Sequence, residues 1–240
     1  MMIGCKSDGG PDELNIEREN NIMLEKMGAF FDARQSGYDA HMLNDIASAR
    51  EFYPFTASLL PKKEDARLLD LGCGTGLELE EYFKLCPSAH VTGIDLAPGM
   101  LQAMQEKFKD KQITAILGSY FSVPFGVSTY DAAVSVESLH HFTMEEKIPL
   151  YRKVCDALRP GGYLILTDYF ALSDEEEHTF RKELLRLKQE EGISDEEFYH
   201  YDTPLTVAHE TEALLRGGFS EVTVEGSWGA TFTLKAVKTN

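Results

Sequence analysis

The fold is decided by the stretch Leu68-Leu69-Asp70-Leu71-Gly72-Cys73-Gly74-Thr75-Gly76. Its apolar residues predict a buried strand, and three glycines at alternate positions follow that strand directly. Glycine allows the backbone to turn sharply and to approach a ligand at a helix N-terminus. A tight strand-to-helix turn without a ligand is the alternative. The spacing G-x-G-x-G differs from the dinucleotide-binding G-x-G-x-x-G, which makes an NAD-dependent dehydrogenase the weakest interpretation.

Around this stretch, short apolar runs alternate with amphipathic segments, which is typical of βαβ units and a parallel sheet. The expected strands are 67–71, 90–94, 112–117, 130–136 and 163–167, and the expected helices are 76–85, 98–108, 143–158, 173–190 and 206–215. Residues 159–162 predict a turn. Two final strand-like runs, 221–225 and 230–237, predict an antiparallel hairpin. We therefore expect an α/β fold with a Rossmann-like, doubly wound, seven-stranded, mostly parallel sheet that ends in this hairpin.

The residues before Pro61 contain no strand pattern. Residues 1–13 are polar and rich in glycine, so we expect a mobile tail. Residues 14–60 repeat apolar side chains at helical spacing, with further helical stretches at 41–50 and 54–60. This organisation predicts a helical segment, 14–60, in front of a main domain, 61–240.

The composition excludes several classes of function. The 240 residues have a formal net charge of −17, which disfavours a broad phosphate-binding surface and an anionic membrane surface. No apolar run is long enough to span a bilayer, and residues 1–5 resemble no signal peptide. Four cysteines without a C-x-x-C pair predict reduced thiols, no metal site and a cytoplasmic location.

Residues 68–76 resemble the first motif of class I S-adenosylmethionine-dependent methyltransferases, and the resemblance extends to about residue 170. It implies that S-adenosylmethionine is the cofactor. Asp95, at the end of the second strand, matches the acidic residue that accepts hydrogen bonds from both ribose hydroxyls. Met100 matches an apolar residue on the adenine face, although packing in the core would also explain it. The cofactor-binding residues implied by these two motifs are Asp70, Gly72, Gly74, Gly76, Asp95, Leu96 and Met100.

Gly118-Ser119-Tyr120 follows the third strand, where the family usually has Gly-Asp and a small or apolar residue. Ser119 replaces the aspartate that would accept from the adenine amino group. The resemblance implies that the Ser119 hydroxyl or a water takes this bond, while the backbone N–H of Tyr120 binds the ring nitrogen. The stretch 158–162, Leu-Arg-Pro-Gly-Gly, resembles the family's structural turn into strand five.

The end of the fourth strand carries the candidate catalytic residues, since ligands bind at the carboxyl ends of strands in such sheets. The resemblance implies that backbone groups near Val136 hold the methionine portion. His140 and His141 resemble a Leu-His-His stretch of the family and are candidates for a general base, with Glu137 as another. Capping of the next helix or packing in the core is the alternative for the two histidines.

Small-molecule members of the family place an N-terminal helical segment as a lid over the methyl donor. By that resemblance, Arg34 and Tyr38 are candidates to lie near the donor's carboxylate. We therefore expect methyl transfer to a small-molecule acceptor, with neither nucleic acid nor membrane as partner; the oligomeric state stays open. Two alternatives keep the cofactor: an enzyme that modifies S-adenosylmethionine or transfers another of its groups, and a non-catalytic regulatory protein that binds it.

Overall fold

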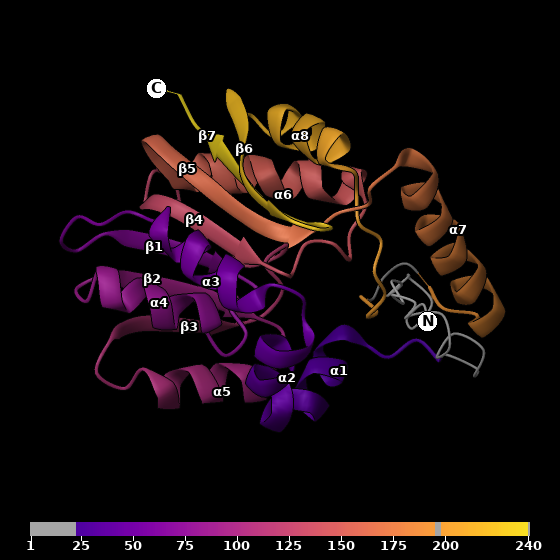
Figure 1. Ribbon diagram of the computed structural model, residues 1–240, viewed down its shortest axis with the longest axis horizontal. Helices are drawn as coiled ribbons and strands as arrows, with labels where there is room; N and C mark the ends of the chain where they lie inside the picture. Colours follow the sequence, from indigo (N-terminus) through magenta and orange to yellow (C-terminus); the bar gives the residue numbers. More distant parts are fainter. Residues whose placement is uncertain (1–22, 195–197, 240) are drawn as a thin grey trace, which may run out of the picture.

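The computed structural model describes residues 23–194 and 198–239, so the expected tail, the start of the helical segment and the acidic run 195–197 lie outside the described residues. Its centre is a seven-stranded sheet of order β3-β2-β1-β4-β5-β7-β6 (Figure 1). The strands are β1 (Arg67–Leu71), β2 (His90–Asp95), β3 (Gln112–Leu117), β4 (Tyr130–Val136), β5 (Leu158–Tyr169), β6 (Glu221–Trp228) and β7 (Thr231–Val237). All neighbours pair in parallel except β7, which is antiparallel to β5 and β6. The expected fold class is confirmed.

Helices cover both faces of the sheet (Figure 1). They are α4 (Leu77–Leu85), α5 (Pro98–Lys107), α6 (Met144–Ala157), α7 (Asp174–Glu191) and α8 (Val207–Arg216). Successive strand residues point to opposite faces. Leu68 therefore packs with α4 and α5, whereas Leu69 packs with α6 and α8. All seven residues of β4 are buried, as expected for a strand covered on both faces.

The N-terminal segment forms α1 (Met27–Arg34), a 3₁₀ turn η3 (Gln35–Gly37), α2 (Tyr38–Asp45) and α3 (Ala49–Ser58). The expected helix 41–50 is wrong, because Ser48 adopts a left-handed backbone with φ 59° and separates α2 from α3. Pro54 lies inside α3 and does not begin a helix. α3 packs against α4, and α1 contacts α5.

Two local motifs have the expected residues. The capping box of α6 is present: the Glu146 N–H donates to Thr143 Oγ1 at 3.4 Å, and the Thr143 N–H donates to Glu146 Oε2 at 2.7 Å. The predicted turn 159–162 lies within β5, where the register with β4 shifts and Gly161 has φ 75°. Among the described helices, none combines the length and apolar character needed to cross a membrane.

Candidate active site

The glycine loop leads from β1 into α4 and is hydrogen-bonded to the carboxyl end of β2. Gly72, Gly74 and Gly76 all have positive φ, at 73°, 48° and 76°, a region in which other residues are strained. The N–H of Gly72 donates to the carbonyl of Ile94 at 2.9 Å, and the N–H of Gly74 donates to Asp95 Oδ2 at 2.9 Å. The loop and the carboxylate of Asp95 are therefore held together before any ligand binds.

Asp95 lies at the carboxyl end of β2, where its other oxygen, Oδ1, accepts from the N–H of Ala97 at 2.8 Å. Burial raises the pKa of Asp95, and the backbone donors around it oppose that rise. Each carboxylate oxygen can accept more than one hydrogen bond, so acceptor capacity remains for a ligand.

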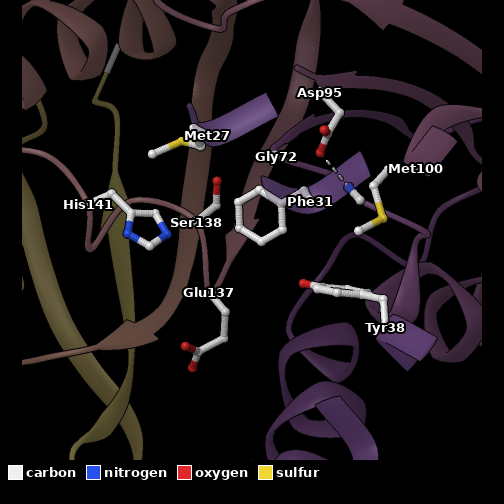
Figure 2. Close-up of a pocket in the computed structure, with 10 residues that line it drawn as sticks. Met27, Phe31, Tyr38, Gly72, Asp95, Met100, Glu137, Ser138 and His141 are labelled. Carbon is white, nitrogen blue, oxygen red and sulfur yellow. Dashed lines mark hydrogen bonds between the residues drawn. The ribbon is translucent and has the colours of Figure 1, made fainter. Parts of the chain in front are cut away.

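A pocket opens beside this loop and collects residues from four parts of the chain. Its lining residues are Met27, Phe31, Tyr38, Gly72, Gly74, Asp95, Met100, Glu137, Ser138 and His141. Figure 2 shows the ring of Phe31 in the middle of the group, with Glu137 and His141 on one side and Asp95 and Met100 on the other. The cavity is about 40 Å³, which is room for a few water molecules and too little for a nucleoside.

Two aspartates attach the N-terminal helices over the pocket. Asp32 Oδ1, on α1, accepts from the N–H of Gly99 at the start of α5 at 2.7 Å. Asp39, on α2, accepts from the hydroxyl of Thr75 in the glycine loop and pairs with Lys107 Nζ at 2.8 Å. These bonds hold α1 and α2 in a closed position.

The two candidates on this segment have different environments. Burial raises the pKa of Tyr38, whose ring lines the pocket. Arg34 instead lies on an exposed surface, where its guanidinium pairs with Glu25 at 2.9 Å and packs on the ring of Phe30. The structure therefore brings Tyr38 to the pocket and directs Arg34 away from it.

The two predicted residues in the loop after β3, Ser119 and Tyr120, are not among the residues that line the pocket. Ser119 Oγ accepts from the N–H of Phe121 at 3.2 Å, so this hydroxyl closes a local turn. Tyr120 is buried, and its hydroxyl donates to the carbonyl of Ser138 at 3.2 Å. Tyr120 thus supports the pocket through Ser138. Leu96 is partly buried against the face of the sheet to which Leu69 points. Val136 is buried on the opposite face, to which Leu68 points.

Asp70 is buried beneath the glycine loop next to Glu78 of α4. Burial, followed by the nearby Glu78, raises the pKa of Asp70 well above its usual range, and burial also raises the pKa of Glu78. Neither oxygen of Asp70 nor Oε1 of Glu78 has a hydrogen-bond partner within the described residues. Such buried acceptors are costly unless a proton or a ligand satisfies them.

His140 and Asp168 form a buried pair at the carboxyl ends of β4 and β5. His140 Nδ1 lies 2.5 Å from Asp168 Oδ1, and Asp168 Oδ2 accepts from the N–H of Leu139 at 2.8 Å. Burial opposes a charge on His140, but the carboxylates of Asp168 and Asp202 outweigh it and raise the pKa of His140. The raised pKa favours a protonated His140 that pairs with Asp168.

The pKa of His141 is shifted in the opposite direction to that of His140. Its Nδ1 lies 3.2 Å from the carbonyl of Tyr201 and 3.2 Å from Asp202 Oδ1, both in the segment before α8. Burial and the charge of His140 lower the pKa of His141. A neutral ring whose Nδ1–H donates to these acceptors has a lone pair on Nε2. His141 lines the pocket, so its ring offers a basic group to the candidate ligand site.

Glu137 directly follows β4 and has a strained backbone conformation, with φ 48°. Such strain is common at functional sites. Burial, followed by the charge of Asp168, raises the pKa of Glu137 to about 8. Its carboxyl group, 4.0 Å from His140 Nδ1, is therefore mostly protonated at neutral pH and can donate a hydrogen bond into the pocket that it lines.

Two residues of this cluster, Asp168 and Asp202, were not predicted from the sequence. Asp168 follows the apolar run of strand five, so its place at the carboxyl end of that strand was a usable signal. Asp202 lies in an irregular segment, and its contacts with the two histidines depend on tertiary structure.

Comparisons with known proteins agree with this geometry. Residues 68–162 match the family model described as a methyltransferase domain. The biotin biosynthesis bifunctional protein BioHC of Teredinibacter turnerae is 30% identical over 157 residues, which are 56% of this chain and 27% of that protein. The O-methyltransferase rstn1 of Aspergillus nomiae is 28% identical over 108 residues, 43% of this chain and 47% of that protein. The chain thus spans between about a quarter and a half of these relatives.

Solved structures share the fold. Human N-acetylserotonin methyltransferase, solved with S-adenosylmethionine, has a TM-score of 0.59 at 17% identity over 88% of this chain and 55% of that one. At this identity the likeness concerns the fold alone. The family match covers the glycine loop, Asp95 and the strands around them. Residues 68–162 of this chain are thus a methyltransferase domain, within a fold shared with S-adenosylmethionine-dependent methyltransferases of known structure.

Proposed function

We propose that this chain transfers the methyl group of S-adenosylmethionine to a small-molecule acceptor. The observation that carries the proposal is one pocket that joins the glycine loop and Asp95 to the side chains of Glu137 and His141. Ribose hydroxyls need an acceptor such as Asp95, and a reacting acceptor needs a base such as His141. A binding protein without turnover needs the first and not the second.

The residues present fit the cofactor. Gly72 and Gly74 line the pocket without side chains, and Asp95 has acceptor capacity for the ribose. Met100 offers an apolar, polarisable surface to an adenine ring. The buried oxygens of Asp70 and Glu78 beneath the loop lack hydrogen-bond partners among the described residues, and the raised pKa values of the two carboxyl groups favour their uncharged forms.

When bound, S-adenosylmethionine supplies a methyl group activated by its positively charged sulfur. The protein's task is then to orient the acceptor, exclude water and take up a proton. Nε2 of His141 accepts the acceptor's proton, while Asp202 and the carbonyl of Tyr201 hold the Nδ1 proton in place. Asp168 stabilises the neighbouring His140 and, through the N–H of Leu139, the loop that carries both histidines.

The helical segment 14–60 is proposed to act as the lid. Its described part places Phe31 and Tyr38 in the pocket, and the closed cavity is too small for the cofactor. Movement of α1 and α2, with the bonds of Asp32 and Asp39 broken, would admit it. The apolar side chains of this segment would then exclude water during transfer.

Turnover tests the proposal. The chain is incubated with S-adenosylmethionine and a panel of small alcohols, phenols, amines and carboxylic acids, and mass spectrometry follows S-adenosylhomocysteine. We expect acceptor-dependent formation of this product, with a rate at least tenfold lower in His141→Ala and an unchanged cofactor Kd. His209→Ala, which alters a surface histidine paired with Glu177, is the control that keeps the full rate.

The same assay separates the alternatives. A nucleoside product other than S-adenosylhomocysteine would indicate transfer of another group of the cofactor. Tight cofactor binding without any product across the panel would favour a regulatory protein. Equal rates for His141→Ala and the unmodified chain would remove His141 as the base.

A further inference from the structure

We propose that His140, His141 and Asp202 form a binding site for a divalent transition-metal ion beside the cofactor pocket. One ligand atom from each of the three residues lies within 4.8 Å of the others. His140 Nε2 is 3.5 Å from Asp202 Oδ1, and His141 Nδ1 is 3.2 Å from the same oxygen. Ligands of a tetrahedral ion at about 2.0–2.1 Å lie roughly 3.3–3.5 Å from one another. The observed separations therefore suit an ion at the centre of the three atoms.

The residue behind His140 fixes the orientation that metal binding needs. Asp168 Oδ1 engages Nδ1 of His140 at 2.5 Å and directs the opposite nitrogen, Nε2, toward Asp202. Asp168 is held in turn by the backbone N–H groups of Leu139 and Tyr169, at 2.8 and 3.0 Å. Metal-binding histidines commonly donate their second nitrogen to a carboxylate in this way.

The ligand set defines the class of ion. Two imidazoles and one carboxylate favour Zn²⁺ and related first-row ions such as Mn²⁺ or Fe²⁺. Mg²⁺ and Ca²⁺ prefer oxygen ligands and are expected to bind weakly here. Three protein ligands leave a coordination position for water or for an oxygen of a small molecule.

The same side chains can also be held together without a metal. A protonated His140, with its Nδ1 proton toward Asp168 and its Nε2 proton toward Asp202, links the two carboxylates as ion pairs. Both arrangements use Nε2 of His140, so an ion has to displace that proton. The experiment therefore has to show that these residues bind an ion, since their proximity is compatible with either state.

A bound ion would prevent His141 from acting as the base, a step that rests on the proposed function. An ion on Nδ1 of His141 uses the lone pair of that nitrogen, so a neutral ring then carries its proton on Nε2. Nε2 is the atom that takes the acceptor's proton in the proposed reaction. Metal binding and base catalysis by His141 thus exclude each other, and Zn²⁺ is expected to inhibit methyl transfer.

Calorimetry with ZnCl₂ and, separately, MnCl₂ tests the site on the full chain after removal of metals with a chelator. S-adenosylmethionine is left out, so failure of this proposal is distinguishable from failure of the proposed function. We expect one Zn²⁺ per chain, with a Kd at least tenfold weaker in His141→Ala and in Asp202→Ala. Asp168→Asn is expected to weaken binding by roughly 10- to 100-fold through the orientation of His140.

The control is His209→Ala, which removes an exposed histidine that lies 2.8 Å from Glu177 and leaves the proposed site intact. This variant is expected to keep the Zn²⁺ affinity of the unmodified chain. Absence of one-to-one binding, or equal affinity in the site variants and the control, would overturn the proposal.

Visible absorption of Co²⁺ added to the unmodified chain gives a second readout that needs no variant to fold. Intense bands of a four- or five-coordinate ion, abolished by one equivalent of Zn²⁺, support the site. A spectrum of hexahydrated Co²⁺ argues against it. If Zn²⁺ binds as expected but raises the rate of methyl transfer, the site stands and His141 is not the base.

Discussion

Gly72 and Ser138 approach each other so closely that a β-carbon on Gly72 would lie 2.7 Å from the β-carbon of Ser138 and still closer to its hydroxyl. Gly72 follows β1 and Ser138 follows β4, and these two strands are neighbours in the sheet. Close contact between these strand ends keeps one side of the pocket narrow, because both residues line it. Glycine at position 72 is therefore required by the space as well as by its φ of 73°.

Gly72→Ala tests this contact, and Gly161→Ala is its matched control. Both glycines have nearly the same positive φ, but a β-carbon on Gly161 would meet no described atom within 4 Å. Gly161→Ala is expected to lower the free energy of unfolding by about 1 kcal/mol, from backbone strain alone. Gly72→Ala is expected to lower it by about 2–4 kcal/mol, because overpacking adds to that strain. Urea unfolding measures both free energies. Equal losses in the two variants would show that Ser138 moves aside without destabilising the fold.

The bonds of Asp39 predict how fast the cofactor enters. Asp39→Ala removes the acceptor of Thr75 and one partner of Lys107, so α2 opens more readily. Stopped-flow measurements are expected to show faster association and faster dissociation of S-adenosylhomocysteine, by about fivefold to thirtyfold for the loss of two contacts that contribute roughly 1–2 kcal/mol together. Asp45→Ala on the same helix removes only the exposed pair with His41 and should leave both rates unchanged. Unaltered rates in Asp39→Ala would show that the bonds of Asp39 do not hold α2 closed over the pocket.

Asp131 predicts a pH dependence of stability. Burial favours its neutral form, but the N–H of Arg67 and the charges of Lys63 and Arg159 outweigh burial and lower its pKa. A lowered folded-state pKa adds stability above the unfolded-state pKa, and this stability is lost as the pH falls through the folded-state pKa.

Asp131→Asn is therefore expected to reduce the free energy of unfolding at neutral pH by about 1–2 kcal/mol. The difference from the unmodified chain should shrink between about pH 5 and about pH 2. Urea unfolding at several pH values measures it, with Asp45→Asn as an exposed control. A difference that stays constant over this range would mean that the charge of Asp131 contributes nothing.

The sheet was predictable because its strands are short apolar runs with clear ends. Strands 67–71, 112–117 and 130–136 agree with the structure to the residue. The N-terminal helices were less predictable, since the break at Ser48 depends on a left-handed backbone that the residue type does not require. Pro54 was expected to begin a helix, but α3 begins five residues earlier, at Ala49, and contains Pro54 in its interior.

The sequence predicted those parts of the candidate site whose residues are close to one another along the chain. The glycine loop and Asp95 are adjacent to strand ends, so the glycine motif and the family resemblance located them. The partners of the histidines were not predictable, because Asp168 is 28 residues from His140 and Asp202 lies in a segment without regular structure. The family resemblance placed Arg34 at the pocket, but in the structure its guanidinium pairs with Glu25.

Isothermal titration of the full chain with S-adenosylhomocysteine tests the central claim most directly. We expect one molecule to bind per chain, with affinity at least tenfold weaker in Asp95→Ala, since a buried acceptor of the ribose hydroxyls is lost. Asp45→Ala should bind as the unmodified chain does. Absence of binding, or an affinity that Asp95→Ala leaves unchanged, would contradict the proposal that this pocket holds the cofactor.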